Sequence, residues 1–103
     1  MRTFYKIKTY KEIKSVTLKG EKFVKHSFLA FKLKQESEFG VGILVTKKFG
    51  NAVKRNFAKR RILAAITFLK PENKNILLVF VPKKNILTCD FDLILKELEC
   101  LLD

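Results

Sequence analysis

The sequence predicts a mixed α/β fold, an α+β two-layer sandwich with a small central sheet, in one domain spanning residues 1–103. Three segments predict this class. Residues 75–82 form a continuous apolar run of strand length, which is typical of a strand buried on both faces. Residues 90–102 repeat their apolar side chains at helical spacing, so this segment should pack one stripe on the sheet. The second half of residues 51–69 also repeats its apolar side chains at helical spacing.

The first predicted element is a short helix over residues 10–18. Thr9 is a candidate N-cap, and Gly20 is placed to end the helix. Ile13 and Thr17 are spaced to share one face of it, so this face should meet the rest of the fold.

Two strands are expected next. Residues 23–33 alternate as a strand does, with Phe28 and Phe31 on opposite sides and room for a short extra strand near residues 23–24. After a polar turn, residues 39–48 form a second strand, whose glycines permit a bend or a close approach.

The main helix is expected over residues 51–69, between Asn51 as its N-cap and Pro71, which disfavours a helical residue before it. The apolar strand follows it. The last helix begins after Asp90 as N-cap and carries Cys100 opposite its apolar stripe. The predicted order is therefore α-β-β-(β)-α-β-α.

The charge of the chain is strongly positive and unevenly distributed. The net charge is +12, but residues 1–84 hold 21 of the 22 basic residues and five of the ten acids, a net charge of +16. These positive charges repel one another, so a polyanion should bind and neutralise them, and nucleic acid is the first candidate. No apolar run approaches the ~20 residues that span a bilayer, and no signal-peptide core is present. We therefore expect a cytoplasmic protein with no membrane partner.

The densest charge lies in the stretch KKFGNAVKRNFAKRRIL, residues 47–63, which holds seven basic residues and no acid. With Asn51 as cap, Lys54 and Arg55 lie near the helix N-terminus, where the macrodipole disfavours a cation by ~0.3–1 kcal/mol. The cations also surround the helix, whereas a merely solvated helix would confine them to one face. A phosphate reverses the sign of this interaction. We therefore interpret the stretch as a polyanion-binding helix.

The segment TKKFGNAVKRNFAKR resembles the signature of the bacterial ribonuclease P protein subunit, which joins the end of a strand to the start of a helix. The likeness extends from about residue 7 to residue 102. It implies the predicted order of elements and a left-handed β-α-β crossover, against the usual rule. The matching residues are Lys47, Lys48, Gly50, Ala52, Val53, Arg55, Asn56, Lys59 and Arg60.

The resemblance implies that the protein does not cut RNA itself. It is expected to bind the catalytic RNA of ribonuclease P and to hold the 5′ leader of precursor tRNA in a cleft between the first helix and the sheet. The RNA, with Mg²⁺, would hydrolyse the phosphodiester, so we expect no catalytic residue and no metal ligand on the protein. The implied RNA-binding residues are Lys47, Lys48, Asn51, Lys54, Arg55, Asn56, Lys59, Arg60 and Arg61. The implied leader-cleft residues are Ile13, Thr17, Phe31, Arg55 and Lys59.

The sequence departs from the family pattern in places that bear on RNA binding. Phe57 stands where the family often has a third basic residue after Arg55 and Asn56. Ile13 and Thr17 stand where aromatic residues usually stack on the leader. Because base stacking is worth ~1–3 kcal/mol per base, leader contacts should be weaker here, and Phe31 should carry a larger share of them.

Two other functions fit parts of the sequence. A non-catalytic RNA-binding module, such as a ribosome-associated protein, would share the charge and the aromatics and stays the alternative. A basic membrane-surface protein is disfavoured by the buried strand. His26, the only histidine, has no catalytic constellation around it, so a structural or RNA-contacting role is favoured. Cys89 and Cys100 lack metal-ligand spacing and are expected to be free thiols.

Overall fold

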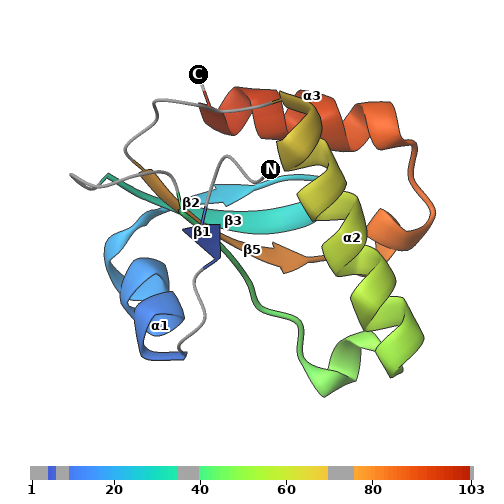
Figure 1. Ribbon diagram of the computed structural model, residues 1–103, viewed down its shortest axis with the longest axis horizontal. Coiled ribbons are helices and arrows are strands. Elements are labelled where there is room, and N and C mark those ends of the chain that lie inside the picture. The colour runs from blue at the N-terminus through green and yellow to red at the C-terminus, as the bar shows by residue number, and fades with distance from the viewer. Residues whose placement is uncertain (1–4, 7–9, 35–39, 70–75, 103) are drawn as a thin grey trace.

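A computed structural model describes residues 5–6, 10–34, 40–69 and 76–102 of the chain (Figure 1). It contains one sheet of five strands in the order β1-β4-β5-β3-β2. The strands are β1 (Tyr5–Lys6), β2 (Glu21–Val24), β3 (Phe28–Lys34), β4 (Gly40–Ile43) and β5 (Ile76–Pro82). The helices are α1 (Tyr10–Lys19), α2 (Ala52–Leu69) and α3 (Phe91–Leu102), with the 3₁₀ turns η1 (Lys47–Phe49) and η2 (Lys84–Leu87).

Strand β5 lies at the centre of the sheet. It pairs antiparallel with β3 and parallel with β4, whose other edge pairs parallel with β1. The apolar run was predicted to be buried on both faces, and Leu78, Val79 and Phe80 are all fully buried. Helix α2 connects β4 to β5 as a β-α-β unit, whose left-handed crossover stays a prediction.

Helices cover the two faces of the sheet differently (Figure 1). Helices α2 and α3 pack together on one face, and α1 lies on the opposite face against β3 and β5. The side chains of β5 alternate between the two, so that Leu78 and Phe80 face α2 and α3 while Val79 meets Val16 of α1. This alternation divides the interior into two clusters with the sheet between them.

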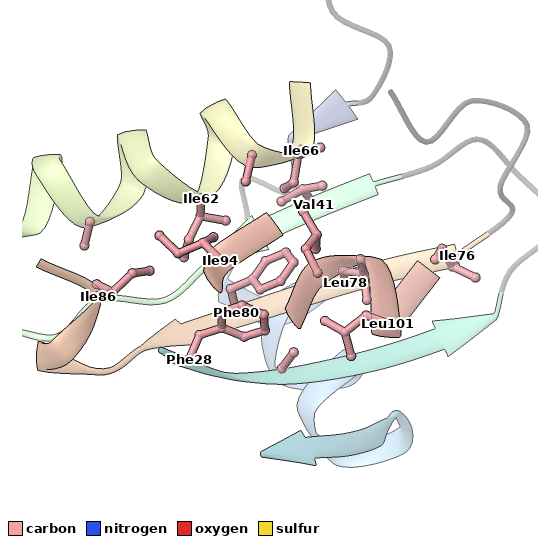
Figure 2. Packing of buried hydrophobic residues seen from close by; sticks show 14 residues of the cluster. Phe28, Val41, Ile62, Ile66, Ile76, Leu78, Phe80, Ile86, Ile94 and Leu101 are labelled. Carbon is pink, nitrogen blue, oxygen red and sulfur yellow. The ribbon is translucent and has the colours of Figure 1, made fainter. Parts of the chain in front are cut away.

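The larger cluster is the main core (Figure 2). Phe28 and Phe80 meet edge to face, with ring centroids 5.2 Å apart. Such an arrangement suits the opposite charges of a ring's face and edge. The helices contribute their predicted apolar stripes, whose buried members are Ala58, Ile62, Ala65 and Ile66 of α2 and Ile94, Leu98 and Leu101 of α3.

Several expected elements have different bounds in the structure. The predicted strand over residues 23–33 is a hairpin, because the chain turns between Val24 and Phe28 and the extra strand there is β2. The second strand ends at Ile43, and the part expected to continue it includes η1. Strand β1 and turn η2 were not predicted: β1 has only two residues, and η2 is a single 3₁₀ turn of four residues. The expected cap Thr9 and the polar turn lie outside the described residues.

Gly20 ends α1 for a reason of space. Its N–H donates to the Val16 carbonyl at 2.7 Å. A Cβ at this position would lie 2.6 Å from that carbonyl oxygen and 2.9 Å from the carbonyl oxygen of Lys32. Both are backbone atoms that cannot move aside, so only glycine lets α1 approach β3 this closely.

The hairpin turn between β2 and β3 is tied to α3 by the carboxylate of Glu97. It accepts hydrogen bonds from the N–H of His26, from the N–H of Ser27 at 3.1 Å and from the Ser27 hydroxyl at 2.6 Å. Ser27 is fully buried, so its hydroxyl depends on a protein acceptor. This contact fastens the turn to α3, and His26 contributes to it through its backbone rather than its ring.

We predict that Glu97→Gln lowers the free energy of unfolding by about 1–2 kcal/mol, because an amide replaces one acceptor oxygen with a donor beside backbone N–H groups. The value lies at the lower end of the usual range because the site is only partly buried. Urea denaturation followed by circular dichroism measures it. The matched control is Glu99→Gln on the exposed side of α3, which should stay within about 0.5 kcal/mol of the parent. Equal stability of the two variants would contradict the tie.

Candidate nucleic-acid interface

The N-terminus of α2 is built by Gly50 and Asn51. Gly50 has φ +154°, a conformation that side-chain-bearing residues rarely adopt, and its N–H donates to the Lys47 carbonyl of η1. The side-chain oxygen of Asn51 accepts from the N–H of Lys54 at 2.9 Å. The predicted N-cap is therefore confirmed, and η1 leads directly into α2 through Gly50 and Asn51.

This corner gathers most of the predicted RNA-binding residues. Ala58 is the first fully buried residue of helix α2, so the first six residues of the helix extend beyond the main core. Neither η1 nor the first turn of α2 contains an acid. The predicted residues that are exposed here are Lys47, Lys48, Asn51, Lys54, Asn56, Lys59 and Arg60. The result is a positively charged surface at a helix N-terminus, which we call the basic corner: η1 and residues 51–60.

Arg55 differs from its neighbours because it is half-buried. Its Nε is inaccessible to solvent and has no hydrogen-bond acceptor among the described residues. A buried donor without an acceptor costs roughly 1–3 kcal/mol. The expected RNA contact of Arg55 stays a prediction beside this unpaired donor.

Arg61 has a role that the sequence did not indicate. Its guanidinium donates to the Ile86 carbonyl at 2.9 Å and to the Cys89 carbonyl at 2.6 Å, which fastens α2 to the segment around η2. The same guanidinium lies over the ring of Phe57, 5.6 Å from its centroid. These carbonyls are 25 and 28 residues away in the chain, so no local pattern could have singled Arg61 out. Its expected RNA contact stays a prediction beside this structural role.

The predicted leader-cleft residues fall on two faces of the sheet. Ile13 and Phe31 come together, partly buried, around Val16 and Val79 between α1 and the sheet. Thr17, on the same helix, donates its hydroxyl to the Lys14 carbonyl at 2.8 Å. Helix α2, with Arg55 and Lys59, packs on the opposite face. The structure therefore brings together the α1 and β3 members of the set and places its two cations in the other layer.

The described residues offer no other evident centre of chemistry. No three His, Cys, Asp or Glu residues gather among them in a way that would hold a metal ion. Cys89 and Cys100 are free thiols, as predicted. Burial raises the pKa of the Cys89 thiol, and the Arg61 guanidinium opposes this shift. In the described part of the chain, no helix combines the length and hydrophobicity needed to cross a membrane.

Comparisons with known proteins agree with these features. Residues 1–103 match the family described as Ribonuclease P. The chain is 41% identical over 76 residues to the ribonuclease P protein component of Ligilactobacillus salivarius, covering 72% of this chain and 67% of that relative. It is 36% identical over 104 aligned positions to that of Listeria innocua, covering 95% of this chain and 85% of the relative.

Solved structures of such proteins have the same fold. The RNase P protein of Staphylococcus aureus matches with a TM-score of 0.80 and 26% identity, over 95% of this chain and 92% of that one. The RNase P protein of Thermotoga maritima matches with a TM-score of 0.80 and 23% identity, over 94% of each chain. These likenesses confirm the predicted fold class.

We predict that Arg61→Ala destabilises the fold by about 1–3 kcal/mol, because it removes two charge-assisted hydrogen bonds to backbone carbonyls. The neighbouring Arg60 is exposed, so Arg60→Ala should change the free energy of unfolding by no more than about 0.5 kcal/mol. Chemical denaturation of both variants measures the difference. If Arg60→Ala were the more destabilising of the two, the structural role of Arg61 would be wrong.

Proposed function

The chain belongs to the ribonuclease P protein component family, and we propose that it binds the catalytic RNA of ribonuclease P and the 5′ leader of precursor tRNA. Membership of the family implies a role in processing the 5′ ends of tRNA. In this proposal the protein assists endonucleolytic removal of the leader, and the RNA subunit carries out the hydrolysis. Processing of bacterial tRNA would place the protein in the cytoplasm.

The observation that carries the proposal is the basic corner. Its cations stand at a helix N-terminus, where the macrodipole and the free N–H groups of the first turn already favour an anion. Without a ligand, Lys54 and Arg55 oppose that field. A phosphate bound there would interact favourably with both the helix dipole and the cations, and would offset the repulsion between them.

Mg²⁺ enters this proposal through the RNA and the substrate. The described residues do not gather a metal-ligand set of His, Cys, Asp or Glu. The contribution of the protein is to neutralise phosphates and to position RNA. Neutralising closely spaced phosphates lowers the repulsion between RNA segments, and a protein subunit should therefore matter most when Mg²⁺ is scarce.

For the leader, the proposal assigns a contact surface to α1 and β3. Phe31 and Ile13 are only partly buried there, so apolar surface remains open beside Val79. A single-stranded leader offers bases that stack on an aromatic ring whatever their sequence. Arg55 and Lys59 lie in the other layer, so we propose that they hold RNA backbone away from Phe31 rather than beside it.

Reconstitution tests the function and separates it from the alternative of a non-catalytic RNA-binding module. The protein should stimulate cleavage of precursor tRNA by the catalytic RNA at low Mg²⁺.

Replacing Arg55, Lys59 and Arg60 together by Ala should weaken RNA binding and reduce the slope of log K against log salt by about 0.7–0.9 for each phosphate that is no longer neutralised. Lys96→Ala, an exposed cation on α3, is the control and should leave the slope unchanged. Binding without stimulation would favour the alternative, and an unchanged slope in the triple variant would exclude the basic corner.

A second prediction concerns the leader. Phe31→Ala in the assembled complex should lower affinity for precursor tRNA by ~1–3 kcal/mol, with little change for mature tRNA, because only the precursor carries a leader to stack. Phe31→Leu keeps apolar volume in the cluster but removes the aromatic face, so it should show the same selective loss with less effect on folding. Leu33→Ala, in the same cluster, is the packing control. Equal losses for both tRNAs in folded Phe31 variants would leave Phe31 as core only.

A further inference from the structure

Helix α2 carries an exposed aromatic residue in the middle of its basic half. Phe57 is 43% exposed, although a single exposed aromatic is not unusual by itself. Its neighbours one turn away on the helix surface are Val53, Lys54, Arg60 and Arg61, which lie three or four residues from it. Of these, Val53 is 74% exposed, and Lys54 and Arg60 are exposed cations. Apolar surface and positive charge therefore occupy the same patch.

The ring of Phe57 is supported from one side by a fixed cation. The Arg61 guanidinium lies 5.6 Å from the ring centroid, and its two hydrogen bonds to the carbonyls of Ile86 and Cys89 hold it in place. A cation over a ring is attracted to its π-electrons, which restricts the rotamers of the Phe57 side chain. A ring that is already ordered loses less entropy when a ligand stacks on it. The Phe57 ring is therefore preorganised to stack on a flat ligand.

The charges around the ring select the kind of ligand. Helix α2 contains no acidic residue, and its exposed cations near Phe57 would repel a basic surface, including that of a second copy of this chain. A ligand that satisfies both features must offer a flat apolar face and negative charges close to it. An unpaired nucleotide does so, because its base stacks on an aromatic ring while its phosphates meet cations.

From this arrangement we infer that Phe57 stacks an unpaired nucleobase, while Lys54 and Arg60 bind the phosphates beside it. The inference rests on the proposed function. It adds a contact with an RNA base to a helix that would otherwise contact only the RNA sugar-phosphate backbone. The base belongs either to the catalytic RNA or to the precursor tRNA leader. The chemistry is the same in both cases, so the experiment has one arm for each source.

Phe68 provides a matched control within the same helix. It is more exposed than Phe57, at 67%, and it also stands on the side of α2 away from the buried stripe. The last turn of α2 contains no basic residue, whereas Phe57 has the exposed cations Lys54 and Arg60 one turn away. It also lies ~16 Å from Phe57 along the axis, at ~1.5 Å per residue. An effect of general surface hydrophobicity should appear at both positions, and base stacking only at Phe57.

The first measurement uses a synthetic single-stranded RNA of roughly ten nucleotides, which is within the usual range for such sites, and a matched oligomer with abasic positions. Phe57→Ala should weaken binding of the normal oligomer by about 5- to 150-fold, which corresponds to the removal of one stacked base. It should scarcely affect the abasic oligomer. Phe57→Tyr should retain binding and Phe57→Leu should not. Phe68→Ala should behave as the parent protein does.

The second measurement identifies the source of the base. Loss of affinity between the Phe57→Ala protein and the catalytic RNA would assign the base to that RNA. Loss seen only when precursor tRNA binds the assembled complex would assign it to the leader. In either case the salt slope should match that of the parent protein, since every phosphate-binding cation is still present.

The outcomes separate this inference from the function on which it rests. If the parent protein stimulates cleavage and folded Phe57→Ala binds every RNA as tightly as the parent, base stacking at Phe57 is wrong and the proposed function stands. Equal losses on the normal and abasic oligomers would also overturn it. If Phe57→Ala and Phe68→Ala lose equally, the outer face of α2 is a general apolar docking surface instead. If the parent protein neither binds the catalytic RNA nor stimulates it, the proposed function fails first.

Discussion

The central strand β5 is buried on both of its faces, and this burial requires the helices on either side of the sheet. Leu78 and Phe80 point to one side of the sheet and Val79 to the other, and none of the three is exposed. Apolar side chains on both faces of a central strand require cover on both faces, because leaving them in water would cost ~1.5–3 kcal/mol for each large residue. Helix α1 therefore covers one face, and α2 with α3 the other (Figure 1).

The packing on β5 leaves the first half of α2 outside the core. Its buried stripe starts at Ala58, so the core fixes the second half of the helix and holds the first half out as an extension. The side-chain oxygen of Asn51 caps the N–H of Lys54 without help from a charged side chain. The cations of the first turns are thus unnecessary for the helix and unfavourable to its dipole, which agrees with their being kept for an anionic ligand.

Residues within one basic run perform different tasks in the folded protein. Lys54, Lys59 and Arg60 face solvent, whereas Arg61 binds backbone carbonyls near η2 and supports the ring of Phe57. Adjacent residues of the helix thus differ: Arg60 is exposed to solvent, whereas Arg61 binds backbone carbonyls. The Arg61 guanidinium therefore contributes to two features at once. It stabilises the contact between α2 and η2, and it orders the Phe57 ring on the surface that we propose to bind RNA.

Elements with local signals could be predicted from the amino-acid sequence: the buried central strand, the amphipathic stripes of α2 and α3, the Asn51 cap and the basic start of α2. Periodicity and capping depend on residues a few positions apart, so they can be read along the chain. The tertiary structure alone decided where the hairpin turns, because Glu97 binds Ser27 from 70 residues away. It alone placed Phe31 and Lys59 on opposite faces and paired the Arg61 guanidinium with backbone carbonyls of Ile86 and Cys89. Contacts between distant segments depend on how the sheet and helices pack, and no local pattern records that packing.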